Sequence, residues 1–162
     1  MTETSDTRPI LVAYDGSPES EAAVRAAASL FPGRRLVVTS VWEPGLAMAI
    51  APAYEPTGIG YMQPSMADVS AVDQAQHDRA AASAVAGAAL ARELGATAEP
   101  YPVPDASDIA RTLAALAGEI GAEAIVVGSR GLGSVKARLL GSTSSGVLHH
   151  TGLPVVVVRA SG

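Results

Sequence analysis

Glycine and hydroxyl side chains gather in one stretch of the chain, from Val126 to His150. The stretch contains five glycines, and the fourth of them is followed directly by four hydroxyl-bearing residues in a row. Glycine lets the main chain approach a ligand closely and adopt positive φ, and the N–H groups at the start of a helix attract anions. The stretch therefore predicts a cradle for an anionic ligand such as a phosphate, with a flexible strand-to-helix connection as the alternative.

Two standard phosphate-binding motifs do not fit this stretch. A Walker loop has the spacing of Gly128 and Gly133, but it requires a lysine where the chain has Ser134. A dinucleotide-binding fingerprint requires a glycine three residues after Gly133, where the chain has Lys136, and it normally follows the first strand of a sheet. A ligand site here must therefore be of another kind.

The spacing that is present fits a clamp with two sides. Gly128 ends an apolar run, Gly131 follows after two residues, and Gly141 opens the hydroxyl-rich helix after nine more. Gly128 and Gly131 are expected to adopt positive φ beside the ligand, while the N-terminal N–H groups of the helix face its negative charge. Asp15, after the first strand, is expected across the same crevice, because open α/β sheets bind ligands beyond the carboxyl ends of their strands.

Apolar runs and helical periodicities alternate along the whole chain. Prolines and glycines separate them, and caps such as Ser17 with Pro18 mark helix starts. This alternation predicts a single α/β domain, 1–162, with a parallel sheet between two layers of helices and a flexible N-terminus, 1–8. Strands are expected at 9–14, 35–42, 97–103, 122–128 and 154–159, and helices at 18–30, about 68–94, 109–120 and 142–150.

The segment 43–67 differs from the rest of the chain. It contains four prolines and three glycines, interspersed with methionine and tyrosine. Proline at this density resists regular structure, and the segment is longer than an ordinary loop. It is interpreted as a mobile flap after the second strand, with a plain connecting loop as the alternative.

Composition limits the possible functions. The 162 residues carry a formal net charge of −5, contain no cysteine and are only 4% aromatic. The acidic balance argues against nonspecific nucleic-acid binding, and the lack of cysteine excludes disulfides, thiolate catalysis and cysteine-ligated zinc. No apolar run reaches the length of a membrane span, and the polar N-terminus does not read as a signal peptide. A cytoplasmic location is expected.

The motifs at both ends of the chain resemble those of the universal stress protein family, in its ATP-binding branch. The resemblance is carried by "ILVAYDGSPESEAAVRAA" near the start and "VVGSRGLGSVKARLLGSTSSGVLHHTGLPVVVVR" at the end. It implies a fold like that of the adenine nucleotide alpha hydrolases, with strand order 3-2-1-4-5. It also implies a homodimer paired through the last strand, Val155 to Val158, which would cover an apolar sheet edge that is otherwise prone to aggregation.

The resemblance further implies ATP, accompanied by Mg²⁺, in the crevice between the first and fourth strands. Asp15 and Ala13 would lie near the adenine and ribose, and Val41 would contact the adenine. The remaining positions carried over from the family would hold the ribose and the phosphates. These are Gly128, Ser129, Arg130 and Gly131 on one side, and Gly141, Ser142, Thr143 and Ser144 on the other.

No catalytic residue is predicted, because the sequence offers neither a nucleophile with a base nor an evident pair of carboxylates. No protein metal site is predicted, and the adjacent His149 and His150 are interpreted as surface residues. A nucleotide-dependent sensor or regulator of the stress response is the leading hypothesis. The alternatives are a slow ATPase or autophosphorylating protein with acceptors at 142–145, a cAMP-binding protein, and an interaction module without nucleotide.

Overall fold

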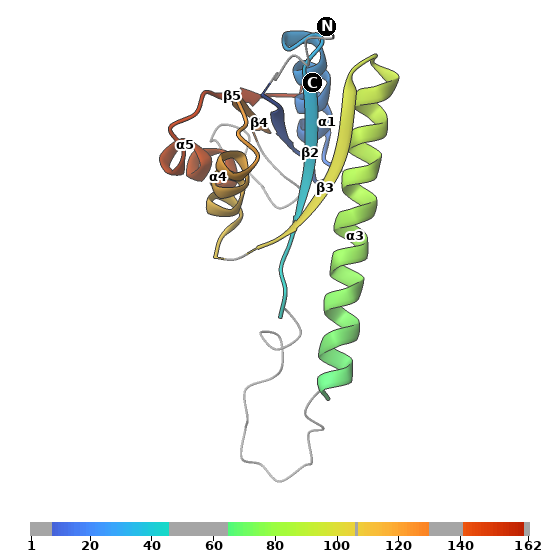
Figure 1. Ribbon diagram of the computed structural model, residues 1–162. Coiled ribbons are helices and arrows are strands. Elements are labelled where there is room, and N and C mark those ends of the chain that lie inside the picture. Colours follow the sequence, from blue (N-terminus) through green and yellow to red (C-terminus); the bar gives the residue numbers. More distant parts are fainter. Residues whose placement is uncertain (1–7, 46–64, 106, 130–140, 161–162) are drawn as a thin grey trace, which may run out of the picture.

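The computed structural model describes residues 8–45, 65–105, 107–129 and 141–160. Within these residues strands and helices alternate along the chain, as the sequence predicts (Figure 1). The predicted flexible N-terminus lies outside them except for Arg8. The elements are β1 (Ile10–Ala13), α1 (Pro18–Leu30), β2 (Arg35–Trp42), α3 (Met66–Glu93), β3 (Thr97–Pro104), α4 (Ile109–Glu119), β4 (Ala124–Gly128), α5 (Ser142–His150) and β5 (Val155–Val158).

The five strands form one parallel sheet in the order β3-β2-β1-β4-β5, which confirms the predicted topology. Val12 of β1 lies between Val38 of β2 and Val126 of β4. The chain first adds strands to one side of β1 and then to the other, so the strand order reverses between β1 and β4. Such a reversal point is where open α/β sheets bind ligands.

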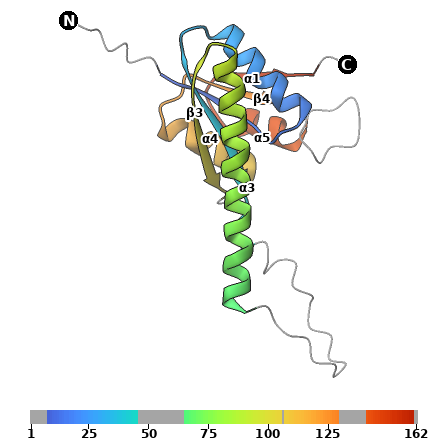
Figure 2. The same cartoon turned by 90° about the vertical axis from the view of Figure 1, so that its right-hand side faces the viewer.

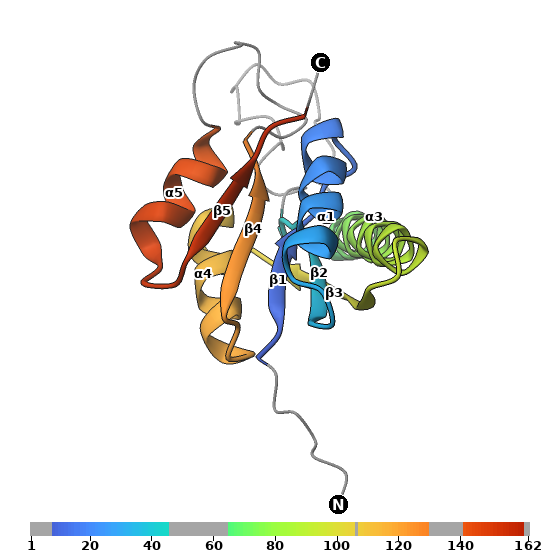
Figure 3. The same ribbon diagram turned by 90° about the horizontal axis from the view of Figure 1, so that it is seen from above.

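Helices cover both faces of the sheet, with α1 and α3 on one and α4 and α5 on the other (Figure 3). Successive residues of a strand point to opposite faces. Ile10 and Val12 therefore join the core beneath α1 and α3, whereas Leu11 joins the core beneath α4 and α5. Both cores are almost entirely aliphatic, as the low aromatic content predicts.

Small residues let α3 lie close to the sheet. Its buried positions are alanines together with Gly87, where a Cβ atom would come within 2.7 Å of the Tyr14 ring and 2.8 Å of Val38. The first half of α3, 66–79, continues past the end of the sheet and is largely exposed (Figure 2). The helix ends at Glu93, and Gly95, just after the Leu94 cap, has a φ of +85°, which suits glycine.

Several element boundaries differ from the predicted ones by one or two residues, and the start of α3 matters most. Ser65 caps α3, and Met66 and Ala67 are helical, so the predicted flap does not extend to residue 67; its remainder, 46–64, lies outside the described residues. Ile109, the first residue of α4, is 36% exposed. None of the helices described by the structure combines the length and the hydropathy needed to cross a bilayer.

Candidate functional site

The turn after β1 holds Asp15 by local hydrogen bonds. The Ser17 amide donates to Oδ1 of Asp15 over 2.9 Å, and the Asp15 amide donates to the Ser20 hydroxyl over 3.3 Å. Ser17 caps α1 as predicted, because its hydroxyl accepts from the Ser20 amide. Gly16 permits the turn with a φ of +80°. The Asp15 side chain is thereby fixed at the carboxyl end of β1, at an exposed position.

Tyr14 lies beside Asp15 with its ring in the core under α3. Burial raises the pKa of the Tyr14 phenol, and the nearby carboxylates of Glu21 and Asp15 raise it further. The phenol therefore stays neutral at physiological pH. The ring packs against Gly87 of α3, where an added Cβ atom would lie 2.7 Å from it.

Hydrogen bonds join the two sides of the predicted clamp, at the end of β4 and the start of α5. The Gly141 amide donates to the Ser129 carbonyl over 2.7 Å, which joins the end of β4 to the start of α5. The buried Ser144 hydroxyl lies 3.3 Å from the Ser129 carbonyl and 3.1 Å from that of Gly141. The Ser129 amide donates to Val158 of β5. The predicted ligand contacts Arg130 and Gly131 lie outside the described residues.

The N-terminus of α5 is not closed by a side chain. Gly141 is its N-cap, and no side chain among the described residues makes a capping hydrogen bond there. The first turn contains Ser142, Thr143 and Ser144, and the amide of Ser145 makes the first helical bond, to the Gly141 carbonyl. A helix start of this kind presents N–H groups and the positive end of the helix dipole to an anion.

Gly128 has a different purpose from the one expected. Its φ is not positive, and a Cβ atom would lie 2.8–2.9 Å from main-chain and Cβ atoms of Glu19 in α1. The glycine therefore allows α1 to pack closely against the end of β4. The predicted positive φ was wrong for Gly128.

A cleft of about 350 Å³ lies beyond the carboxyl ends of β1 and β2. It brings together Asp15 and Val41, which the family motif had placed around adenine and ribose. Ala13, also predicted there, lies half-buried at the end of β1. The sequence did not suggest the wall supplied by α3. The cleft is lined by Asp15, Ser40, Val41, Trp42, Glu43, Gln76, Arg79, Ala80, Ser83 and Ile109.

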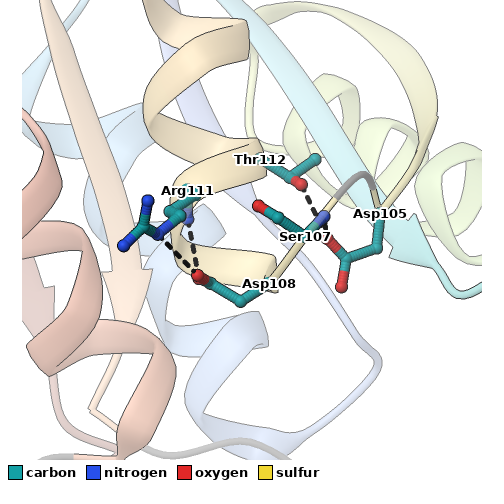
Figure 4. Close-up of polar contacts among 5 residues, drawn as sticks. All are labelled: Asp105, Ser107, Asp108, Arg111 and Thr112. Atoms are coloured by element: carbon teal, nitrogen blue, oxygen red, sulfur yellow. Dashed lines mark hydrogen bonds and ion pairs between the residues drawn. The ribbon is translucent and has the colours of Figure 1, made fainter.

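Ile109, at the edge of this cleft, is positioned by a polar network around the start of α4 (Figure 4). Asp108 caps α4 by accepting the Arg111 amide over 2.9 Å, and the Arg111 side chain returns to the same carboxylate over 3.0 Å. Asp105 accepts the Thr112 hydroxyl and, through its amide, donates to the Trp42 carbonyl over 2.7 Å. The network ties the start of α4 to the end of β2.

Trp42 separates this cleft from a second one of about 440 Å³ along the first half of α3. The His77 ring meets the indole edge-on, with ring centroids 5.7 Å apart, and lies 3.3 Å from Asp78. The Trp42 Nε1 atom is buried without a hydrogen-bond partner in the part of the chain that the structure describes. Asp73 accepts the Gly45 amide over 2.8 Å and fixes the chain after β2.

Few charged groups line the cleft among the residues that the structure describes. The cleft carries the carboxylates of Asp15 and Glu43 and the guanidinium of Arg79. Within residues 8–45, 65–105, 107–129 and 141–160, no group of three or more histidine or acidic side chains is placed to hold a metal ion. His149 and His150 are exposed at the end of α5. The arrangement suits a small ligand with an apolar ring at one end and negative charge at the other.

Comparison with known proteins gives a consistent result. A family model described as the universal stress protein family matches residues 6–159. A universal stress protein of Mycolicibacterium smegmatis is 34% identical over 98% of this chain and 50% of its own length. One from Thermus aquaticus is 33% identical over 94% of this chain and 98% of its own length. The chain thus spans about half the length of the mycobacterial relatives it matches.

Solved structures share the fold. A universal stress protein in complex with cAMP is 26% identical, with a TM-score of 0.61 over 95% of this chain and 98% of its own. One from Archaeoglobus fulgidus in complex with dAMP is 21% identical, with a TM-score of 0.59 over 93% and 97%. A family protein from Arabidopsis thaliana with AMP bound is 15% identical, with a TM-score of 0.63 over 96% and 93%.

Proposed function

Because this chain belongs to the universal stress protein family, we propose that it binds an adenine nucleotide, Mg-ATP, across the carboxyl ends of β1, β2 and β4. The observation that carries the proposal is the pairing of two features. The cleft lined by Asp15 and Val41 offers a place for base and ribose, and the open N-terminus of α5 offers a place for phosphates. The bound nucleotides of similar structures support the same ligand class.

Each end of the nucleotide has its own set of residues. The base packs against Val41, and the ribose lies near Asp15 and Ala13. Phosphates are held by main-chain N–H groups and hydroxyls, and Mg²⁺ arrives with them. The Ser144 hydroxyl already bonds the Ser129 and Gly141 carbonyls, so Ser144 contributes its amide. The proposed phosphate contacts are Gly128, Ser129, Arg130, Gly131, Gly141, Ser142, Thr143 and Ser144.

Binding of cAMP is the second candidate, favoured by the structurally similar universal stress protein that was solved with cAMP. Either nucleotide would make the protein a ligand-dependent regulator of the stress response in the cytoplasm. We propose that it acts as a homodimer joined through β5. Occupancy of the site would then be passed to a partner through this assembly, rather than through turnover of the nucleotide.

Calorimetric titration with Mg-ATP and with cAMP tests the proposal, using Gly141→Asp as the diagnostic variant. Gly141 has a φ of −62°, which any residue adopts. An aspartate there caps α5 with its own carboxylate and repels a phosphate. We expect the affinity for ATP to fall by about tenfold or more, with an unchanged or raised Tm.

The matched control is Gly152→Asp, which adds the same charge beyond the other end of α5, where a Cβ atom meets nothing within 4 Å. This variant should bind ATP like the wild type. Unchanged ATP affinity in Gly141→Asp would remove the phosphate site. A wild-type protein that binds neither nucleotide would remove the proposed function altogether.

A further inference from the structure

We propose that one face of α3, formed by Gln76, Arg79 and Ser83, recognises the base of the bound nucleotide and sets its preference for adenine. The inference rests on the proposed function and extends it, because the nucleotide-binding motifs of the sequence do not include α3. The three residues line the same cleft as Asp15 and Val41. They are spaced by three and four positions along the helix, so their side chains lie on one face.

This wall is anchored rather than loosely attached. Ala80, which also lines the cleft, is 5% exposed, and Ala84, one turn further, is fully buried. The close approach at Gly87 holds the same helix against Tyr14 and Val38. Gln76 and Ser83 are half-buried and Arg79 is exposed, so their polar ends remain available to a ligand. Positions on a packed helix define a recognition surface more rigidly than a loop does.

The topology places α3 at the base end of the nucleotide. Its helix packs over β2 and β3, whereas α5 lies on the opposite face beside β4 and β5 (Figures 1 and 3). Phosphates bound at the N-terminus of α5 therefore leave the base to extend toward β2. Val41 and Ile109 supply apolar surface there. The cleft volume of about 350 Å³ suits a part of a nucleotide, at the low end for ligand sites.

The two longer side chains have different chemistry. A glutamine amide carries one donor and one acceptor group, which match N7 and N6 of adenine, whereas guanine presents two acceptors at that edge. Gln76 therefore favours adenine over guanine. The planar Arg79 guanidinium covers a face of the base by stacking and cation–π attraction, which any purine accepts. Ser83 adds a hydroxyl deeper along the same face.

Titration of the full chain with Mg-ATP and Mg-GTP separates these roles. Trp42 is the single tryptophan of the chain and lines the cleft, so its fluorescence reports occupancy. We expect the wild type to prefer ATP, and Gln76→Ala to lower the ATP-to-GTP preference by about tenfold. Arg79→Ala should weaken both nucleotides alike by about threefold to tenfold, and Arg79→Lys should not restore them, because an ammonium lacks the planar surface.

Matched controls are Gln74→Ala, which lies outside this cleft on the same helix, and Arg25→Ala on the exposed face of α1. Both should bind like the wild type. The inference is overturned if the wild type binds ATP and GTP equally, or if Gln76→Ala and Arg79→Ala leave affinity and preference unchanged. In those cases the proposed nucleotide site still stands. A wild type that binds no nucleotide overturns both.

Discussion

The two halves of the sheet, on either side of β1, end in opposite ways. β3 forms one edge and carries prolines at 100, 102 and 104, whereas β5 forms the other edge with four consecutive valines. The half with β3 is covered by the long, alanine-rich α3. The half with β5 is completed by the short α5, whose start has no side-chain cap among the described residues. Each half thus supplies one end of the proposed nucleotide site and one type of edge.

The hydrogen bonds between β2 and β3 show how the prolines affect this edge of the sheet. The Asp105 amide donates to the Trp42 carbonyl in β2. The main-chain N–H and C=O groups of the odd-numbered β3 residues therefore point toward β2. The prolines occupy the even-numbered positions, where an N–H group would point outward. The edge therefore offers no donor over 100–104 to an added strand. Proline is tolerated at such an edge, and here it also blocks further pairing.

The β5 edge has the opposite property. The Ile125 amide donates to the Pro154 carbonyl, and the Ser129 amide donates to the Val158 carbonyl. The main-chain groups of the even-numbered residues of β5 therefore point toward β4. Val155 and Val157 therefore direct their main-chain groups outward. No strand among the described residues pairs with these groups, and the homodimer proposed above would pair them with a second copy of the chain. Within the described part of the chain, the prolines close one edge, whereas the other keeps its main-chain donors and acceptors.

Removing an outward donor from β5 is expected to have the largest effect. Val157→Pro deletes that N–H group in both copies of the proposed antiparallel pair while keeping the ladder bonds to β4. We expect the dimer dissociation constant to rise about 100-fold, measured by analytical ultracentrifugation. Val157→Ala keeps the donor and should remain largely dimeric. A Val157→Pro protein that is still a dimer would place the interface elsewhere.

The two glycines where elements pack closely, Gly128 and Gly87, should differ in how well they tolerate an added methyl group. Gly128→Ala drives a methyl group into the α1 main chain, so we expect a loss of about 2–3 kcal/mol in unfolding free energy. Gly87→Ala meets side chains of Tyr14 and Val38, which can shift, and gains helix propensity, so its cost should stay near 1 kcal/mol. Urea denaturation measures both.

The control for this pair is Gly118→Ala in α4, where an added Cβ atom meets nothing within 4 Å. Alanine there should stabilise the protein by about 0.5–1 kcal/mol. A larger cost at Gly87 than at Gly128 would contradict the view that main-chain contact makes the β4 side the less tolerant one.

Opening the proline edge should have a smaller effect. Pro100→Thr with Pro102→Thr restores two outward N–H groups on β3 and should allow strand addition there. We expect the double variant to associate beyond the wild-type state at about tenfold lower concentration, followed by light scattering. The control is Glu99→Thr, which introduces the same residue at a position whose N–H group points toward β2. Equal association of the double variant and the wild type would show that the prolines do not protect this edge.

Most of the fold was readable from the sequence, because apolar runs of strand length alternate with capped helical segments. Ser17 and Pro18 marked the start of α1, which the structure confirms. The parallel order of the strands came from the family resemblance, since an apolar run does not specify its neighbours. The same resemblance drew attention to Asp15 and Val41, which the cleft brings together.

The α3 wall and the purpose of Gly128 could not be read in the same way. Alanine occurs on most faces of α3 itself, so the apolar periodicity of its sequence does not indicate which face is buried. Gln76 and Arg79 were overlooked for this reason, although their spacing beside Ala80 and Ala84 was a possible signal. A glycine in a sequence shows that space is needed, but it does not show whether a ligand or a neighbouring helix fills that space.

The starts of α3 and α5 give the smallest expected effect and the finest contrast between the halves. The Ser65 hydroxyl and amide both donate to Asp68, over 2.7 and 2.9 Å, and hold the pKa of the Asp68 carboxyl below its usual range. This capping box stabilises the start of α3 above the ordinary pKa of aspartate, and the contribution disappears as the pH falls through the lowered pKa. α5 has no such carboxylate cap among the described residues.

Amide hydrogen exchange at several pH values tests this contrast. Acidification should accelerate the corrected exchange of the Asp68 and Val69 amides, which bond to Ser65, severalfold, while the first turn of α5 responds to added Mg-ATP instead. Ser65→Ala should raise the pKa of Asp68 toward its ordinary value and make the start of α3 fray already at neutral pH, whereas Ser65→Thr retains the cap. If the start of α3 exchanges equally in the wild type and in Ser65→Ala, the capping box does not stabilise it. If acid accelerates exchange at both helix starts alike, their caps do not distinguish them. The lack of a carboxylate cap at α5 would then no longer support an anion site there.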